Sequence, residues 1–186
     1  MKQALEREAY DSRQAGRSLA YAIQHGAPIH TIPCPIRLGP DEQCVGTGPV
    51  SLLQYVGADV QWTEKHGGGW GLGSILVMGA ANAIGNSSRK AAAMRQAAVQ
   101  WRVVDQGRMW LTNQRFAVQA SEWINLWHEN VNMSCCDGLA IELHFDGMPP
   151  TRLRMPYADW WYVMMQWVGF SVLTFPSESD REIEPT

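Results

Sequence analysis

The sequence lacks the features of several common protein classes. Charged residues make up only 18% of the chain, and the net charge of −3 leaves no excess of Lys and Arg. A general nucleic-acid-binding protein needs such an excess to contact phosphates, so nucleic acid is not an expected partner. Residues 1–26 mix acidic and basic side chains without the apolar run of a signal peptide, and we therefore expect a cytoplasmic protein.

The motifs of phosphate-binding and metal-binding proteins are missing as well. The Gly-rich run that begins at Gly67 has no Gly-Lys-Ser/Thr ending, and no Gly-x-Gly-x-x-Gly motif is placed between a strand and a helix. His128 and Glu129 precede two cysteines, but no second set of ligands has metal-binding spacing, so a structural histidine is expected. The sequence predicts no catalytic residue, no metal site and no cofactor, and hence a protein that is not an enzyme.

The cysteines do not indicate a disulfide framework. There are four of them, none in a Cys-x-x-Cys pair: Cys34, Cys44, Cys135 and Cys136. We expect buried free thiols in a reducing compartment. A disulfide between the first two would require the chain between them to fold back, and one between the adjacent pair would be strained.

The chain does contain enough apolar residues for one core. It has 186 residues, of which 46% are hydrophobic, and this size and composition fit a single domain. Nine of the residues are tryptophans. Tryptophan favours protein interfaces and the membrane–water boundary, although a Trp-rich core would use the same residues.

Three flanking segments differ from the part that is expected to form the domain. Small and apolar residues at spacings of three and four predict a helix over residues 1–26, with a stripe of Leu5, Ala9, Ser12, Gly16, Leu19 and Ile23. Residues 27–41 are predicted to be a Pro-rich linker, because proline disfavours both helix and central strand. Residues 173–186 are predicted to be an acidic disordered tail.

From residue 42 onward, short segments of period two end in turn signals, which is typical of antiparallel sheet. The predicted strands are 44–55, 60–65, 101–111, 115–119, 123–134, 139–145 and 151–155. In the clearest case a buried face alternates with an exposed face, namely Leu139, Ile141, Leu143 and Phe145 with Ala140, Glu142, His144 and Asp146. Glu142 is expected to face an arginine of the next strand.

Residues 112–114 are predicted to form a tight turn between two of these strands. Thr112 and Asn113 carry short polar side chains that hydrogen-bond their own backbone, and asparagine tolerates positive φ. Arg115, which comes directly after the turn, is expected to brace it.

The last predicted element is a helix over residues 158–172. It is apolar on nearly every face and includes Trp160, Trp161 and Trp167. Such a helix needs to be covered, and it is too short for a membrane span, which takes about 20 apolar residues. We expect it to cap a β-barrel.

The middle of the chain resembles the pleckstrin-homology-like (PH-like) domains of bacteria and the related GRAM-like domains. In residues 107–118 a small residue, an apolar strand, a Thr-Asn turn, an arginine and a second strand follow one another as in that family. Residues 127–131 stand where the family has its next strand, and 138–153 resembles its ending of two alternating segments around a glycine turn. The resemblance covers residues 42–172 and implies an α+β fold, with an antiparallel β-barrel capped by a C-terminal helix.

Residues 66–100 depart from the family pattern and are predicted to be a Gly/Ala-rich helical insertion between early strands. No acidic residue occurs between Lys65 and Val104 in this otherwise acidic protein. The candidate binding residues are Trp70, Leu72, Ile75, Leu76, Arg89, Lys90 and Arg95. The apolar ones would enter a lipid boundary and the basic ones would meet anionic head groups, unless the insertion packs on the barrel with its arginines in solvent.

The expected function is that of a non-catalytic binding module. In the first hypothesis the insertion associates peripherally with an anionic lipid surface at the inner face of the membrane. In the alternative the domain binds a protein partner through an open sheet edge, or self-associates as a homo-oligomer through small residues of the insertion. The first predicts salt-sensitive binding to anionic lipid, and the second predicts stable oligomers or a partner without lipid.

Overall fold

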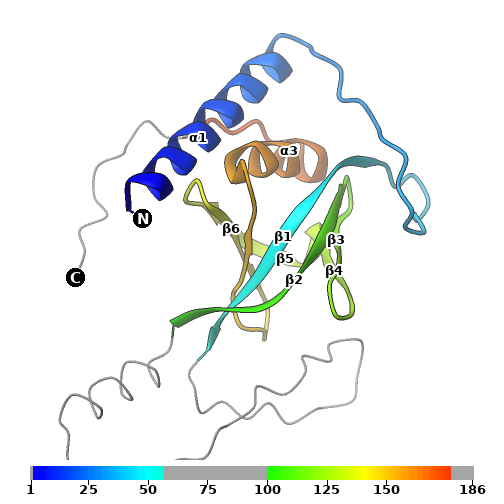
Figure 1. Cartoon of the computed structure of the whole chain (residues 1–186). Helices are drawn as coiled ribbons and strands as arrows, with labels where there is room; N and C mark the ends of the chain where they lie inside the picture. Colours follow the sequence, from blue (N-terminus) through cyan, green and yellow to red (C-terminus); the bar gives the residue numbers. More distant parts are fainter. Residues whose placement is uncertain (1, 57–99, 177–186) are drawn as a thin grey trace, which may run out of the picture.

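The computed structural model describes residues 2–56 and 100–176, which have an α+β fold with a seven-stranded antiparallel sheet. One helix precedes the sheet in the chain and one follows it, which confirms the predicted fold class at this level. Helix α3 lies between α1 and the sheet (Figure 1). In chain order the elements are α1 (Lys2–Gln24), β1 (Cys44–Val56), β2 (Gln100–Thr112), β3 (Arg115–Gln119), β4 (Trp123–Trp127), η1 (His128–Asn130), β5 (Val131–Cys136), β6 (Ala140–Phe145), β7 (Thr151–Arg154) and α3 (Ala158–Phe170).

The sheet is centred on β1. Its strand order is β4-β3-β2-β1-β7-β6-β5, and every pair is antiparallel. β1 pairs with β2 along its whole length and with β7 over residues 51–54. Register shifts after Cys44 and after Leu52 mark bulges, which bend a strand and increase its twist. In the strand order given above, β4 and β5 are the two outer strands of the described sheet.

The predicted strand 123–134 is wrong as a single element. The structure divides it into β4 and β5, with the short 3-10 helix η1 between them. Among the described strands, β4 pairs with β3 alone and β5 with β6 alone. The chain thus leaves one edge of the sheet and joins the opposite edge, which a straight strand could not do. The predicted strand 60–65 lies outside the described residues.

The alternation predicted for β6 and β7 is largely confirmed. Ile141, Leu143 and Leu153 have no exposed surface. Arg152 Nε donates to Glu142 Oε2 at 2.7 Å, which is the cross-strand pair that the pattern predicted. Such a half-exposed pair stabilises the fold by about 0.2–1 kcal/mol.

Two positions of β6 differ from the prediction. Ala140, expected to be exposed, is 7% exposed, because it follows a turn that helix α1 covers. At Gly138 of that turn an added Cβ would stand 3.1 Å from the Ala9 Cβ of α1. Phe145, expected on the buried face, is only half-buried, because it lines a surface groove at the end of the strand.

Helix α3 packs its apolar surface against the sheet and against α1. Ala158, Val163 and Met165 have no exposed surface. Trp161 lies over Gly46 of β1, where an added Cβ would stand 2.4 Å from the indole Cζ3. The helix ends before the predicted residue 172, because Ser171 has a left-handed conformation with φ of 56°.

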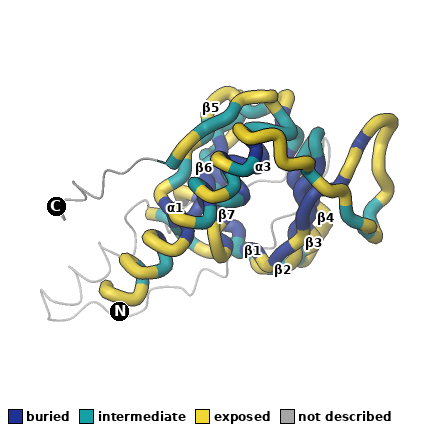
Figure 2. Tube along the Cα trace, turned by 90° about the horizontal axis from the view of Figure 1, so that it is seen from above, coloured by how far each residue is buried: buried dark blue, intermediate teal, exposed yellow. Residues whose placement is uncertain are grey.

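Helix α1 packs on α3 through the stripe of small residues that the sequence indicated. Ser12 Oγ donates to Asp159 Oδ2 at 3.0 Å and accepts a bond from the Asp159 backbone N–H at 2.9 Å. Burial raises the pKa of Asp159, and the bond from Ser12 opposes this rise. Figure 2 shows exposed residues (yellow) along α1 that alternate with more buried ones. The buried residues of the stripe are Ala9, Ser12, Gly16, Ala20 and Ile23.

The cysteines are free thiols, as expected, but only Cys44 is buried. The Ile32 N–H donates to the Cys44 carbonyl at 2.8 Å, so the linker does fold back along β1. Burial raises the pKa of Cys44 to about 11, and the neighbouring Cys34 thiol adds to the rise. Cys44 is therefore a protonated core residue at neutral pH.

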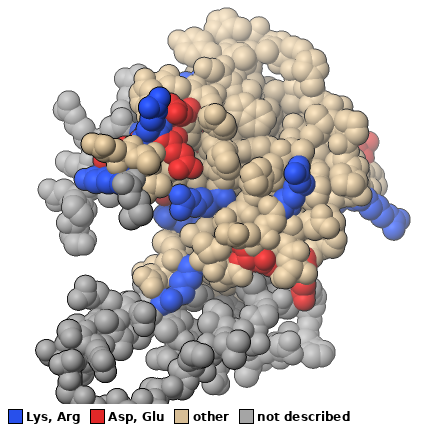
Figure 3. Space-filling view, in the orientation of Figure 1, with Lys and Arg blue, Asp and Glu red and all other residues tan. Residues whose placement is uncertain are grey.

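The described surface carries rather few charged side chains. Uncharged residues predominate on the face shown in Figure 3. Within residues 2–56 and 100–176, no helix combines the length and the apolar character that crossing a membrane requires. In the predicted tail, the Pro176 carbonyl accepts a bond from Arg17 Nε at 3.2 Å, and residues 177–186 lie outside the described part.

Candidate ligand-binding groove

A groove opens between the outer strands β4 and β5 and the turn that follows β6. Its volume is about 560 Å³. The lining combines aromatic, amide and carboxylate side chains from three segments of the chain, namely Trp123, Asn125, Leu126, Trp127, Glu129, Asn130, Asn132, Phe145, Asp146 and Met148.

The walls of the groove are strands from opposite ends of the sheet. η1 has only three residues, so the end of β4 and the start of β5 lie close together. The described strands show no pairing between β4 and β5. Each therefore presents one edge of backbone N–H and C=O groups that can pair with another extended chain.

Helix α3 covers the edge of β5 at the end farther from the groove. Tyr162 Oη donates to the Ser134 carbonyl at 3.1 Å, and Gln166 Nε2 donates to Ser134 Oγ at 2.8 Å. Next to the groove, by contrast, Asn132 and Met133 are exposed. The accessible part of this edge is the part that borders the groove.

The aromatic side chains of the groove are held in place from behind. Trp123 is 48% exposed and stacks on Trp110 of β2, with 5.6 Å between ring centroids. Trp127 lies under the guanidinium of Arg115, which stands 4.6 Å from the ring centroid. Supported rings of this kind offer a ligand apolar area with little loss of side-chain entropy.

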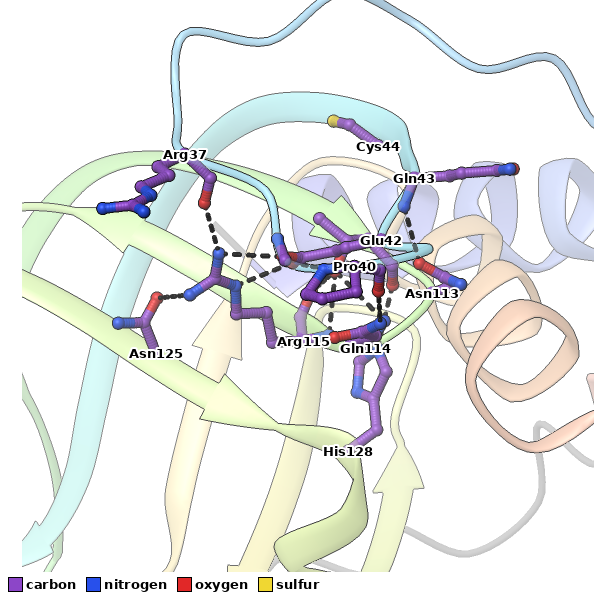
Figure 4. Close-up of polar contacts among 12 residues, drawn as sticks. Arg37, Pro40, Glu42, Gln43, Cys44, Asn113, Gln114, Arg115, Asn125 and His128 are labelled. Carbon is purple, nitrogen blue, oxygen red and sulfur yellow. Dashed lines mark hydrogen bonds and ion pairs between the residues drawn. The ribbon is translucent and has the colours of Figure 1, made fainter.

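A buried ion pair anchors the β4 wall. The Glu42 side chain has no exposed surface, and Arg115 Nε lies 2.8 Å from Glu42 Oε1. Arg115 Nη2 donates to Glu42 Oε2 at 3.0 Å, which makes the pair bidentate (Figure 4). Thr112 Oγ1 and the Gly39 N–H donate to the same carboxylate at 2.8 and 2.7 Å. We call Glu42, Thr112 and Arg115 the Glu42 cluster.

The Glu42 carboxylate is ionised in spite of its burial. Burial raises the pKa of Glu42, but the hydrogen bonds from Gly39, Arg115 and Thr112 and the charge of Arg115 outweigh it, and the pKa is lowered overall. Bonds to the charged form of an acid favour that form. The cluster is thus a salt bridge inside the fold.

Arg115 connects the Glu42 cluster to the groove. Its Nη1 donates to Asn125 Oδ1 at 3.0 Å, and its Nη2 donates to the Arg37 carbonyl at 2.9 Å. The first bond fixes a groove side chain and the second fixes the Pro-rich linker. The Arg115 side chain therefore links the β4 wall of the groove to the linker and to Glu42.

The turn before Arg115 also holds the linker. Thr112 Oγ1 accepts bonds from the backbone N–H groups of Gln114 and Arg115, as predicted for a side chain that bonds its own turn. Asn113 bonds the end of the linker and the residue before β1 instead of its own turn. Its Oδ1 accepts from the Gln43 N–H at 2.8 Å, and its Nδ2 donates to the Asp41 carbonyl. The positive φ in this region belongs to Asp41, not to Asn113.

His128 is a buried structural residue in the described fold. Its Nε2 lies 3.0 Å from the Thr112 carbonyl, and the rings of Phe116 and Phe170 pack around it. Burial lowers the pKa of His128, and the bond to Thr112 only partly opposes this. The ring is neutral at pH 7 and donates from Nε2, because a carbonyl accepts. Among residues 2–56 and 100–176 no group of His, Cys, Asp and Glu side chains is arranged to hold a metal ion.

The sequence did not predict the groove. The predicted binding residues all lie outside the described part of the chain: Trp70, Leu72, Ile75, Leu76, Arg89, Lys90 and Arg95. A signal for the groove was present in 123–127, where Ile124 and Leu126 are buried and the residues between them are not. The outward face of this short strand carries Trp123, Asn125 and Trp127, which is an unusual set for a solvated surface.

Comparisons with protein-family models, with curated proteins and with solved structures found no match.

Proposed function

We propose that the chain is a non-catalytic binding module that holds an extended segment of a protein partner in the groove between β4 and β5. The observation that carries this proposal is the groove itself, which is lined by supported aromatic rings and bordered by two strand edges that pair with no other described strand. Strand addition to a sheet edge supplies affinity through main-chain hydrogen bonds, and pockets for side chains supply specificity. An extended peptide in this groove would form main-chain hydrogen bonds with the strand edges and place its side chains against the groove lining.

The PH-like assignment is part of the same proposal. The resemblance of residues 42–172 implies about six or seven antiparallel strands followed by one apolar helix, and seven strands followed by one helix are described in the structure. PH-like and GRAM-like domains often bind peptides or lipids. In this chain the described residues favour a peptide, because the groove offers strand edges and amide side chains.

Selection of displayed random peptides on the purified full-length chain tests the proposed function. We expect enriched peptides whose affinity falls at least about tenfold in Trp123→Ala, because a central aromatic anchor is typically worth about 1.4 kcal/mol or more. Trp123 is half-exposed, so the variant is expected to remain folded. Fluorescence anisotropy with each enriched peptide gives the affinities.

Trp101→Ala is the matched control. Trp101 lies on β2, packs against Tyr55 and Arg152, and does not line the groove. Equal loss of affinity in both variants, or a selection that enriches no peptide, would contradict the proposed function.

Peripheral association with an anionic membrane is the second candidate. Val56 pairs with Gln100, so the chain enters and leaves the segment 57–99 at neighbouring points of the sheet. Close to these points Tyr55 is 47% and Val103 53% exposed, and Tyr55 contacts Trp101. Exposed aromatic and apolar side chains beside a segment whose residues 66–99 include no acidic residue favour contact with a lipid surface.

Co-sedimentation with liposomes tests this candidate. We expect salt-sensitive binding to anionic but not to neutral vesicles, and loss of that binding when Trp70, Arg89 and Lys90 are all replaced by alanine. Trp123→Ala serves as the control and should bind the vesicles like the unchanged protein. Equal binding of all three proteins, or no sedimentation with either vesicle, would exclude the membrane candidate.

A further inference from the structure

The charges that line the groove carry one inference beyond a general peptide site. Glu129 and Asp146 are its ionisable lining residues, and none of the ten lining residues in the described chain is Lys, Arg or His. Both carboxylates are exposed. In the described part of the chain, no salt bridge joins either of them to a cation. The groove therefore presents negative charge that is not compensated within its own walls.

The hydrogen bond that Asp146 makes does not remove this charge. Asn132 Nδ2 donates to Asp146 Oδ1, and an amide donor is neutral. The bond ties the carboxylate to the β5 wall of the groove, since Asn132 belongs to β5 and Asp146 follows the neighbouring strand β6. A ligand cation would thus meet a positioned carboxylate.

The guanidinium of Arg115, which contacts the lining residues Asn125 and Trp127, is already engaged. Arg115 makes a bidentate pair with Glu42, and its positive charge is balanced inside the fold. Its position 4.6 Å from the Trp127 ring centroid shows that the groove's aromatic wall supports a cation–π contact. Trp123 and Phe145 provide further aromatic surface in the same groove.

We infer that the groove selects a basic segment, in which a lysine or arginine side chain of the partner lies between the aromatic rings and the carboxylates of Glu129 and Asp146. This inference rests on the proposed peptide-binding function. An aromatic surface combined with a carboxylate recognises a cation more strongly than either does alone, because the ring faces and the acid both attract positive charge. An acidic segment would face repulsion at the same place, which makes charge the basis of discrimination.

Capped synthetic peptide pools test the inference. Each pool contains extended peptides of about six residues, the usual length of a strand. One residue position is fixed in turn as Lys, Arg, norleucine, Gln or Glu, and binding to the full-length chain is followed by fluorescence anisotropy. We expect the Lys and Arg pools to bind about tenfold tighter than the norleucine and Gln pools, and the Glu pool to bind weakest. Added NaCl should reduce the preference.

The double variant Glu129→Gln/Asp146→Asn should lose the preference and keep the affinity for neutral pools. Its matched control is Glu6→Gln/Asp11→Asn, which removes the same charge from two exposed positions of α1. The control should keep the preference. Equal binding of basic and neutral pools, or a preference that survives in the groove variant, overturns the inference while peptide binding itself stands. No binding of any pool overturns both the inference and the proposed function.

Discussion

Arg115→Ala is expected to destabilise the fold by about 3–5 kcal/mol. The substitution leaves the Glu42 carboxylate without its cation while its side chain has no exposed surface, and an unpaired buried charge carries a penalty of this size. It also removes the bonds that hold Asn125 and the Arg37 carbonyl. The free energy of unfolding, measured by urea denaturation at neutral pH, gives the loss.

The control for Arg115→Ala is Arg152→Ala. Arg152 also forms a close ion pair, with 2.7 Å between its Nε and Glu142 Oε2, but the Arg152 side chain is 28% exposed. Water compensates for the lost charge there, and we expect a loss of about 1 kcal/mol or less. Similar losses in the two variants would contradict the view that the Glu42 cluster is a buried anchor.

The effect of Arg115→Ala should also depend on pH. Because the pKa of Glu42 is lowered in the fold, its ionisation contributes stability above its unfolded pKa, which is near 4.3, and this contribution is lost as the pH falls through the folded pKa. In the variant the pKa is expected to rise, because burial remains and the cation is gone. The difference in unfolding free energy between the two proteins should therefore be largest at neutral pH and shrink towards pH 4 and below.

Trp161→Ala is expected to cost about 3–5 kcal/mol, the usual range for removing a buried aromatic side chain. Trp161 is 9% exposed and fills the space between α3 and β1. An added Cβ at Gly46 would stand 2.4 Å from its Cζ3, and one at Gly48 would stand 3.1 Å from its Cζ2. The ring and the two glycines are therefore matched in shape, and thermal or urea denaturation should show the loss.

A double-mutant cycle tests this match directly. Gly46→Ala alone should cost about 1–3 kcal/mol, because the new methyl group collides with the indole. In the Trp161→Ala background the same change should cost clearly less, since the space is vacant. Trp123→Ala, at a half-exposed ring, is the comparison variant and should change the stability far less than Trp161→Ala. Additive costs at 46 and 161 would show that the ring does not occupy the space over β1.

Local sequence patterns predicted the elements whose faces are set by their own neighbours. The alternation over 139–145 and 151–155 gave β6 and β7, and the small residues at spacings of three and four gave the packing face of α1. Thr112 likewise bonds its own turn, as its short hydroxyl side chain suggested. In each case the signal lies in residues that are close in the chain, even where the face packs on a distant element, as α1 does on α3.

The parts that sequence could not predict depend on residues that are far apart in the chain. Glu42 and Arg115 are separated by 73 positions, and nothing near either residue shows that they pair. The chain breaks at His128 because residues 123–127 pair with β3 at one edge of the sheet, whereas residues 131–136 pair with β6 at the other edge. The groove needs β4, β5 and the turn after β6 together, so no single segment contains it.

Backbone amide chemical shifts during titration with an enriched basic peptide test the central claim most directly. We predict saturable shifts that cluster at the groove, on residues of β4, on 131–133 and on the turn after β6, and that need at least about tenfold more peptide to reach half-saturation in Trp123→Ala. Shifts that cluster instead at the cavity lined by Glu8, Val50 and Arg154, or that spread evenly over the surface, would contradict the assignment of the groove as the binding site.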